Sequence, residues 1–496
     1  MPSKPQSAPV DPDGDGPFST TAPHIDLVHE EGTLHRGLQN RHIQLIAIGG
    51  AIGTGLFMGS GKTISIAGPS IIIVYTVIGA MLFFVMRAMG ELLLHNLNYK
   101  SFQDFSAEFL GPWAGFFAGW TYWLCWIVTG MADIIAVAGY WNFWIHPQNP
   151  VDLQPMAIIL ALATLVFLLI LNLLTVSLFG ELEFWFAIIK VVAIVALIVA
   201  GAIMVITRFT APDGTQASLG NLWNRPGGVF PHGIVGFFAG FQIATFAFVG
   251  IELVGATAAE TANPRKSLPK AINQIPIRVL IFYVFSLIAI MAVTPWDKVN
   301  PSVSPFVNLF ALLGLVSAAA LMNFVVLTSA SSAANSGLFS TSRMLYGLSH
   351  RGMAPKMVGK LSPRKVPRIG LLSSVMIIGC SMLLLFSDSI MAAFTIVTTI
   401  SAVLFIFVWS LILLSYIVYR RRHPQAHADS IYKMPGGVPM CWVVLCFFAF
   451  IIVLLTQQED TLRALMVTPV WFIVLGVSWV LIKEKVRPDN SHIETA

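Results

Sequence analysis

Charged residues are scarce in this chain. Only 11% of its 496 residues are Asp, Glu, Lys or Arg, whereas 56% are hydrophobic and the mean hydropathy is +0.78. A soluble domain carries about 25% charged residues, so this chain has too few charges to cover a soluble surface. Apolar runs long enough to cross a bilayer recur along the sequence. The composition therefore excludes a soluble globular protein and predicts an all-α membrane protein.

The chain also lacks clustered cysteines and a signal peptide. Its four cysteines lie inside apolar runs and form no C-x-x-C pair, so no metal site, redox role or cofactor is predicted; they are Cys125, Cys380, Cys441 and Cys446. Residues 1–40 show no apolar period and no basic segment followed by an apolar one. We interpret them as a flexible cytoplasmic tail.

The apolar runs predict about twelve transmembrane helices. They cover residues 42–63, 70–94, 112–143, 155–175, 183–207, 236–259, 275–293, 306–332, 369–386, 390–419, 439–456 and 466–482. They are called spans 1 to 12 below. An even number of spans places both termini on one side of the lipid bilayer.

The basic residues decide which side that is. Lys and Arg total 23 on the side of the termini and 5 on the opposite side. Because basic residues remain in the cytoplasm, both termini are predicted to be cytoplasmic. The net charge of +5 is then a topology signal and does not indicate a nucleic-acid partner. The predicted organisation is a tail (1–40), a ten-helix transport core (41–419), a loop with spans 11 and 12 (420–483) and a C-terminal tail (484–496).

Span 1 is unusually rich in glycine, with Gly49, Gly50, Gly53 and Gly55 within seven residues. Each glycine in a helix interior costs up to about 1 kcal/mol, so the pattern predicts a break in the helix. A break at membrane depth bares peptide groups, which is tolerated where they line a polar cavity. The N–H groups that begin the next half-helix suit a carboxylate, and Thr54 adds a hydroxyl. The alternative is a glycine-rich packing face on an intact helix.

The same span contains Gly59-Ser60-Gly61-Lys62-Thr63, which mimics a phosphate-binding loop. The full motif needs glycine five residues before Gly61, where Leu56 stands, and a preceding strand, which is absent. We therefore reject ATP binding at this segment.

Span 6 carries Gly250 and Gly255 together with the carboxylate of Glu252. A charge at this depth is costly and marks a functional position by default. The alternative is a structural carboxylate that backbone groups of a broken helix satisfy. Spans 1 and 6 each open a five-helix set, and matching interruptions in two halves point to a transporter's binding site.

Span 5 contains Lys190, seven residues beyond Glu183, which places it roughly 10 Å deep if the span begins at Glu183. An apolar medium disfavours the charge of an amine, so the functional interpretation is a group that gains and loses a coupled proton. The alternative is a fixed charge paired with a carboxylate. Weaker candidates are Asp133 in span 3 and Asn172 in span 4.

Near the predicted cytoplasmic end of span 2, Arg87 and Glu91 stand four residues apart. Oppositely charged residues at this spacing lie on one helix face. We expect them to form a local pair.

From about Leu34 to the C-terminus the sequence resembles the bacterial amino acid transporter family of the amino acid–polyamine–organocation superfamily. The segments that carry the resemblance are NRHIQLIAIGGAIGTGLFMGSGKTIS, FVMRAMGELLL, GWTYW with TGMADIIA, GELEFWFAIIKVVAIV, GFFAGFQIATFAFVGIELVGATAAET and FVVLTSASSAANSGLFSTSRML.

The resemblance implies a five-plus-five inverted-repeat fold of the LeuT type, with discontinuous helices 1 and 6 and two additional C-terminal helices. It implies that the substrate's carboxylate meets unwound span 1 and that its ammonium meets carbonyls of unwound span 6. The implied substrate residues are Ile52, Gly53, Thr54, Gly55, Phe246, Ala247, Val249 and Gly250. Phe246 stands where relatives have a gating aromatic, and Lys190 matches a lysine that in some relatives occupies a cation site and couples to protons. Glu252 is the second residue assigned to proton coupling.

The function expected from these residues and from the resemblance is proton-coupled import of D-alanine, D-serine and glycine by alternating access, and the protein is not an enzyme. The expected partners are the amino acid, protons and the lipid bilayer, with the oligomeric state left open. The alternatives are a sodium-coupled symporter or an exchanger of other neutral amino acids with the same fold, and a non-transporting amino acid sensor.

Overall fold

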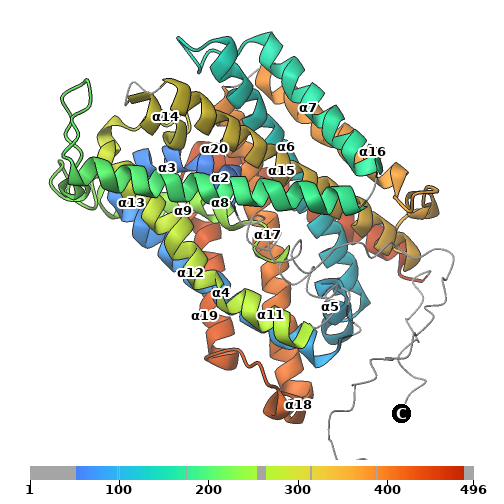
Figure 1. The fold of residues 1–496 in the computed structure, drawn as a ribbon. Helices are drawn as coiled ribbons and strands as arrows, with labels where there is room; N and C mark the ends of the chain where they lie inside the picture. Colours follow the sequence, from blue (N-terminus) through green and yellow to red (C-terminus); the bar gives the residue numbers. More distant parts are fainter. Residues whose placement is uncertain are drawn as a thin grey trace, which may run out of the picture. The chain divides into compact units, whose positions relative to one another are not determined.

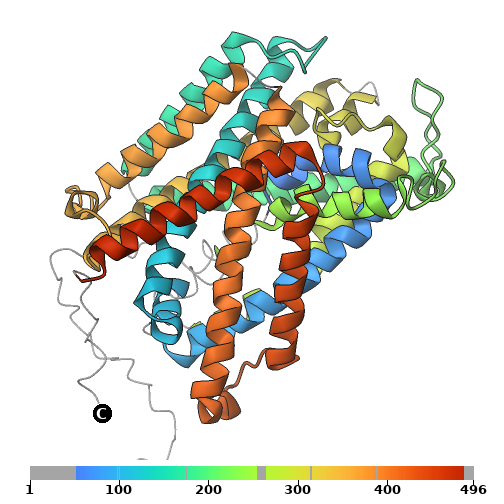
Figure 2. The ribbon, with the colours of Figure 1, turned by 180° about the vertical axis from the view of Figure 1, so that it is seen from behind.

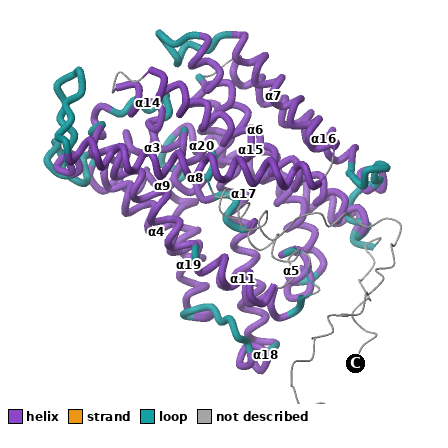
Figure 3. Tube along the Cα trace, viewed as in Figure 1, coloured by secondary structure: helices purple, strands orange, loops and turns teal. Residues whose placement is uncertain are grey.

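The computed structural model describes residues 52–97, 99, 101–174, 176–253, 264–312, 316–386 and 389–484. Within these ranges the chain is helices joined by loops, and one β-bridge pairs Thr210 with Gln216 (Figure 3). The predicted all-α class is therefore confirmed. The predicted N-terminal tail and the start of span 1 lie outside the described residues, as do residues 485–496 of the predicted C-terminal tail.

In the described part of the chain, ten continuous helical stretches are long and apolar enough to cross a membrane. The single-helix spans are α4 (Ile71–His95), α6 (Pro112–Ile145), α7 (Pro155–Leu174), α8 (Val176–Ile206), α15 (Val316–His350), α17 (Ile390–Arg422), α19 (Gly437–Leu454) and α20 (Glu459–Ile482). Two spans are composite. Span 7 joins α11 (Pro264–Asn273), α12 (Ile275–Arg278), the π-helical η4 (Val279–Phe285) and α13 (Ser286–Val293), and span 9 joins α16 (Arg368–Gly379) to η7 (Cys380–Phe386).

The two predicted spans that do not count separately are spans 1 and 6, both of which were predicted to be broken. The described part of span 1 is α2 (Thr54–Phe57) and α3 (Gly59–Ala67), and η1 (Gly68–Ser70) joins α3 directly to α4. The described part of span 6 is a shorter apolar stretch made of α9 (Gly233–Ala244) and η3 (Thr245–Phe248). The second half of span 1 is thus counted together with span 2, and the remaining parts of spans 1 and 6 lie outside the described residues.

Short elements connect the spans. They are α5 (Phe102–Leu110), η2 (Leu219–Leu222), η5 (Trp296–Lys298), α14 (Pro305–Leu312), η6 (Lys356–Gly359) and α18 (Pro424–Asp429). Helix α5 begins with a capping box between Ser101 and Asp104. The corner between α5 and α6 is at Gly111, whose φ of 106° favours glycine, and Pro112 then starts α6.

Burial separates an inner from an outer set of helices. The most apolar windows of α6 and α17 are each 78% buried, whereas those of α7 and α20 are 22% and 11% buried. Helix α7 lies beside α16 (Figure 1), and α20 crosses α17, which also packs along α19 (Figure 2). Because the outer helices expose apolar side chains, their free faces suit lipid, while α6 and α17 form the interior against which the broken spans pack.

The start of predicted span 8 differs from the structure. Its first part forms the separate helix α14, and the membrane-length helix is α15. Phe306 of α14 is fully buried and its ring packs edge-on against Phe57, with centroids 4.8 Å apart. The apolar sequence of α14 therefore serves to cover span 1, a use that apolar periodicity cannot distinguish from crossing the bilayer.

Candidate functional site

Span 6 is interrupted as predicted. After η3, Val249 adopts extended backbone angles (φ −60°, ψ 137°), and Gly250 has a φ of +96°. That φ lies in the left-handed region, which glycine adopts without steric cost. Glu252 follows the turn directly. Gly250 therefore allows the break, because the backbone conformation at this position favours glycine over every other residue.

In span 1 the backbone of Gly53 is extended, with a φ of −134° and a ψ of −164°. Helix α2 starts at the next residue, and the Gly53 carbonyl accepts hydrogen bonds from the N–H groups of Leu56 (3.2 Å) and Phe57 (3.3 Å). Ile52, one residue earlier, is 1% exposed. The second half of span 1 thus begins as a helix at Thr54, with its first N–H groups facing back toward the break.

The two interrupted segments touch at Gly55. A Cβ atom added there would lie 2.5 Å from the Cα and 2.9 Å from the N of Ala247, and 3.0 Å from Cδ1 of Phe246. These distances leave no room for any side chain, so the backbones of α2 and η3 are in direct contact. At Gly53, by contrast, the nearest atom to an added Cβ is Cβ of Ala333 at 3.9 Å.

The carbonyls of η3 already have partners. The Tyr283 hydroxyl donates to the Ala247 carbonyl (2.8 Å), and the Val249 N–H donates to the Phe246 carbonyl (3.1 Å). Each carbonyl oxygen keeps a second lone pair. The Phe246 ring is buried and packs edge-on against Phe394, with centroids 6.0 Å apart. Tyr283 lies in the π-helical part of span 7, and no sequence pattern singled it out.

Thr54 connects span 1 to span 3. Its hydroxyl donates to Oδ1 of Asp133 at 2.8 Å, and Asp133 is 1% exposed. The second carboxylate oxygen of Asp133, Oδ2, has no hydrogen-bond partner among the described residues. The charge of Lys190 also acts on Asp133. Asp133, which the sequence marked only as a weaker candidate, is therefore the carboxylate that faces the break in span 1.

Lys190 lies in a buried polar network that joins spans 5 and 8. Its Nζ donates to the Ser332 hydroxyl (3.1 Å), which in turn donates to Glu183 Oε2 (2.7 Å). Asn335 donates to Glu183 Oε1 (2.8 Å) and accepts from Asn172 of span 4 (2.7 Å). The network supplies Lys190 with carboxylate neighbours, so both interpretations of this lysine, coupling group and fixed charge, fit the geometry.

The helix of span 5 begins earlier in the chain than predicted. The sequence placed the edge of span 5 at Glu183, but α8 begins at Val176 and Glu183 is only 5% exposed. Lys190 is therefore roughly 21 Å along the helix from its first residue. Glu183 was missed because it was used as the boundary. The seven-residue spacing between Glu183 and Lys190, two helical turns on one face, is the signal that identifies the pair.

Glu252 belongs to a different cluster. It is fully buried, its Oε1 accepts a hydrogen bond from the Tyr122 hydroxyl (3.3 Å), and its Oε2 has no hydrogen-bond partner in the described residues. The Tyr122 ring packs edge-on against Trp126 and Phe405. Lys190 and Glu252, which the sequence assigned to one coupling role, thus have separate sets of neighbours.

Comparison with known proteins identifies the group. Residues 42–492 match the amino acid permease family. The chain belongs to this family. The D-serine/D-alanine/glycine transporter of Escherichia coli (strain K12) is 62% identical over 93% of this chain and 96% of its own length. The amino-acid permease AapA of Bacillus subtilis (strain 168) is 50% identical over 94% and 98%, and the aromatic amino acid transport protein AroP of Escherichia coli O157:H7 is 39% identical over 92% and 98%.

Membership of the permease family implies the inverted-repeat fold that the sequence resemblance predicted, and it makes the protein a multi-pass membrane transporter and not an enzyme. The broken helices and the buried polar network around Lys190 are therefore features of an amino acid transporter.

The predicted pair between Arg87 and Glu91 is wrong. Glu91 is 1% exposed and accepts hydrogen bonds from the Tyr416 hydroxyl (2.9 Å), the Met434 N–H (2.8 Å) and the His427 ring. The Arg87 guanidinium donates to Asn273 Oδ1 (2.8 Å) and lies 3.9 Å from the centre of the Tyr432 ring. These partners come from α17, from the segment after it and from the end of α11, so local spacing along span 2 cannot reveal them.

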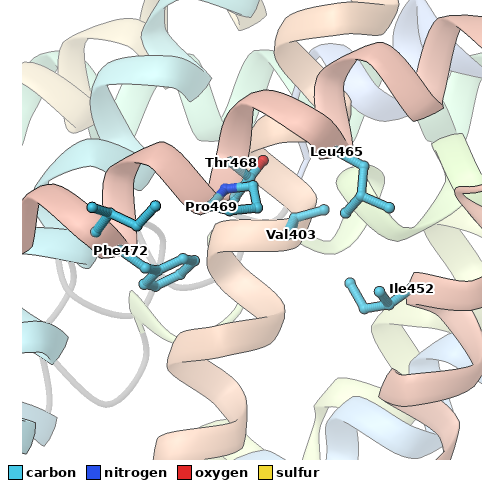
Figure 4. A pocket seen from close by; sticks show the side chains of 7 residues that line it. Val403, Ile452, Leu465, Thr468, Pro469 and Phe472 are labelled. Carbon is cyan, nitrogen blue, oxygen red and sulfur yellow. The ribbon is translucent and has the colours of Figure 1, made fainter. Parts of the chain in front are cut away.

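One cavity of about 410 Å³ lies elsewhere in the permease, among α17, α19 and α20 (Figure 4). It is lined by Val403, Ile452, Leu465, Thr468, Pro469, Phe472 and Ile473. Because this lining offers almost no polar group, it does not suit a zwitterion. Across the part of the chain that the structure describes, no group of three His, Cys, Asp or Glu side chains is arranged to hold a metal ion.

Proposed function

We propose that this permease imports small neutral amino acids, D-alanine, D-serine and glycine, with protons by alternating access. The observation that carries the proposal is the direct contact between two broken helices at Gly55 and Ala247, beside the Asp133–Thr54 hydrogen bond. Broken helices at membrane depth expose peptide dipoles that suit the two ends of a zwitterion. The substrate class follows the relative that is 62% identical.

In this proposal the substrate's carboxylate binds where α2 begins, and its ammonium binds at the carbonyls of η3. The proposed binding residues are Ile52, Gly53, Thr54, Gly55, Phe246, Ala247, Val249 and Gly250, with Phe246 also closing over the site. Close packing at Gly55 supports a small substrate, because the two segments leave little space between them.

Lys190 and Glu252 are the proposed proton-coupling residues. Both are buried at membrane depth, where an ionised group is costly unless it is paired. Lys190 has Glu183 and Asp133 as charged neighbours, so loss of its proton changes the charge balance next to the hydrogen bond that holds Thr54. An ammonium in a cation site also opposes sodium, which favours protons over sodium as the coupling ion.

The proposed location is a bacterial inner membrane with both termini in the cytoplasm, since the basic residues favour that side. The transport core is residues 41–419, and spans 11 and 12 are additions to it. A thiol reagent that does not cross membranes should label a cysteine placed in the 207–217 hairpin of intact cells. Labelling of that cysteine only after lysis would reverse the proposed orientation.

The function is tested with purified permease in liposomes. Labelled glycine should accumulate when a proton gradient is imposed, without sodium, and unlabelled D-alanine and D-serine should compete better than large L-amino acids. Lys190→Ala should abolish gradient-driven accumulation, whereas Lys298→Ala, which changes an exposed lysine of the extramembrane loops, should not. Unchanged accumulation by Lys190→Ala would refute the coupling role, and strict sodium dependence would favour the sodium symporter. A protein that binds glycine but never moves it would be a sensor.

A further inference from the structure

The segment Gly59–Thr63, which mimics a phosphate-binding loop, is part of helix α3. Its glycines permit close contacts. A Cβ added at Gly61 would lie 2.8 Å from the carbonyl oxygen of Val303 and 3.2 Å from that of Asn300, and one at Gly59 would lie 3.4 Å from Ile243 Cγ2. Helix α3 therefore packs closely against α9 and against residues 300–303, which precede α14.

Lys62 of this segment connects three spans. Its Nζ donates to the Thr395 hydroxyl of α17 at 3.1 Å and lies 3.6 Å from Oδ2 of Asp460 at the start of α20. Thr395 is 2% exposed, so one partner is buried, whereas the Asp460 side chain is 58% exposed. Spans 1, 10 and 12 thus meet at one ammonium group.

The position of Lys62 relative to the break in span 1 indicates what its contact with Thr395 and Asp460 does. Lys62 is eight residues beyond Thr54, where the second half of span 1 begins. It is also one of the few basic residues on the side opposite the predicted cytoplasmic termini. At the break, the Phe246 ring of η3 packs edge-on against Phe394 of α17. Because η3 also touches the start of this half-helix at Gly55, spans 1, 6 and 10 lie together there.

We propose that Lys62 is the outer gate residue of the permease. Its contacts with Thr395 and Asp460 hold the outer half of span 1 against α17 and α20, and both contacts break before substrate enters from outside. This inference rests on the proposed alternating-access transport. It gives α20, the last helix among the described residues and one outside the proposed ten-helix core, a part in gating through Asp460.

The two contacts contribute unequally. An exposed ion pair such as Lys62–Asp460 is weak and is screened by salt, whereas a charged hydrogen bond to a buried hydroxyl is stronger. We expect loss of the Asp460 carboxylate to shift the gate toward open about twofold, and loss of the lysine to shift it about tenfold. The Asp460 effect should disappear at about 1 M salt, where the screening length is about 3 Å.

Gate opening is measured with a cysteine reporter at Ser60. Ser60 is fully buried on α3, its hydroxyl has no hydrogen-bond partner in the described residues, and cysteine has nearly the same shape. Ser60→Cys is placed in a chain whose four native cysteines are changed to serine. Its rate of reaction with a membrane-impermeant maleimide is then measured in intact cells.

Lys62→Met, which keeps the length of the side chain but no donor, should raise the labelling rate about tenfold, and Thr395→Val should raise it about fivefold. Lys62→Arg, which keeps charge and donors, should restore a rate near that of the unaltered gate. The matched control is Lys298→Met. Lys298 donates to Asp213 at 2.7 Å and lowers the pKa of that carboxyl to about 2, but it lies outside spans 1, 10 and 12.

Transport of glycine is measured on the same variants, and Lys62→Met should lower the maximal rate more than it changes KM, since an open outer gate slows the return step. Labelling that is equal in Lys62→Met, Thr395→Val and the control would overturn the gate. If the labelling rates change as expected but neither the unaltered protein nor any variant transports an amino acid, the gate role of Lys62 is supported and the proposed function is refuted. If transport is present and labelling does not respond, the function stands and the gate fails.

Discussion

Substitution of Gly55 by alanine tests whether the two broken spans must touch. The new methyl group would lie 2.5 Å from Cα of Ala247, whereas real Cβ atoms essentially never approach another heavy atom closer than 3.0 Å. The obstructing atoms belong to the backbone, so no side-chain rotation can relieve the contact. The segments must move apart instead.

The size of the effect follows from two opposing terms. Overpacking of a closely packed interior costs about 3 kcal/mol at the upper end. Alanine in place of glycine in a helix returns up to about 1 kcal/mol. The net cost is about 2 kcal/mol, which corresponds to a roughly 30-fold weaker binding of substrate.

Gly476→Ala in α20 is the matched control. Gly476 is a helical glycine outside the proposed binding site, and no atom lies within 4 Å of the methyl group that alanine would add. We expect it to bind substrate within about threefold of the unaltered permease, because a methyl group in open space adds no steric cost.

Both variants are assayed by binding of labelled glycine to purified protein and by uptake into liposomes. The reasoning is refuted if Gly55→Ala binds as tightly as the unaltered protein. It is also refuted if Gly476→Ala is equally damaging, because the loss of binding would then not depend on the contact between Gly55 and Ala247.

Three further substitutions test other contacts. Tyr283→Phe removes the donor to the Ala247 carbonyl, a net loss of about 1 kcal/mol, so KM for uptake should rise about fivefold; an unchanged KM would show that this hydrogen bond does not position η3. Glu183→Gln keeps the size of the side chain but removes the negative charge near Lys190, so accumulation driven by a proton gradient should fall about tenfold while protein levels hold, and wild-type accumulation would contradict the network's part in coupling. Glu91→Gln weakens a buried acceptor of three hydrogen bonds, which should lower stability by about 2 kcal/mol; an unaltered melting temperature in detergent would contradict that assignment.

Much of the architecture follows from local sequence. The lengths of the apolar runs located most spans because a bilayer demands a minimum helix length. Glycine density pointed to the part of span 1 where Gly53 is extended and α2 begins, and glycine with a buried carboxylate pointed to the turn of span 6 at Gly250. These features are predictable because glycine destabilises a helix interior, so several glycines close together indicate that the helix is interrupted there.

What could not be predicted depends on contacts between distant segments. The role of Glu91 was misassigned because its partners lie more than three hundred residues away, at Tyr416, His427 and Met434. Glu183 was misplaced because an acidic residue at the apparent start of an apolar run normally marks the interface. Here Asn335 and Ser332 satisfy it inside the bundle, and neither residue is visible from the sequence of span 5.

The hydrogen bond from Thr54 to Asp133 connects the proposed proton site to the proposed substrate site. Lys190 is bonded within spans 5 and 8, whereas Thr54 begins the half-helix that meets the substrate. Asp133 accepts the hydrogen bond from Thr54, and its carboxylate is one of the charges that act on Lys190. A carboxylate beside an ammonium is a weaker acceptor for a hydroxyl than one whose cationic neighbour has lost its charge. Under the proposed coupling role of Lys190, removal of its proton would strengthen the hydrogen bond that fixes the start of α2, and return of the proton would loosen that bond. The proposal thus links a proton and an amino acid that need not touch each other.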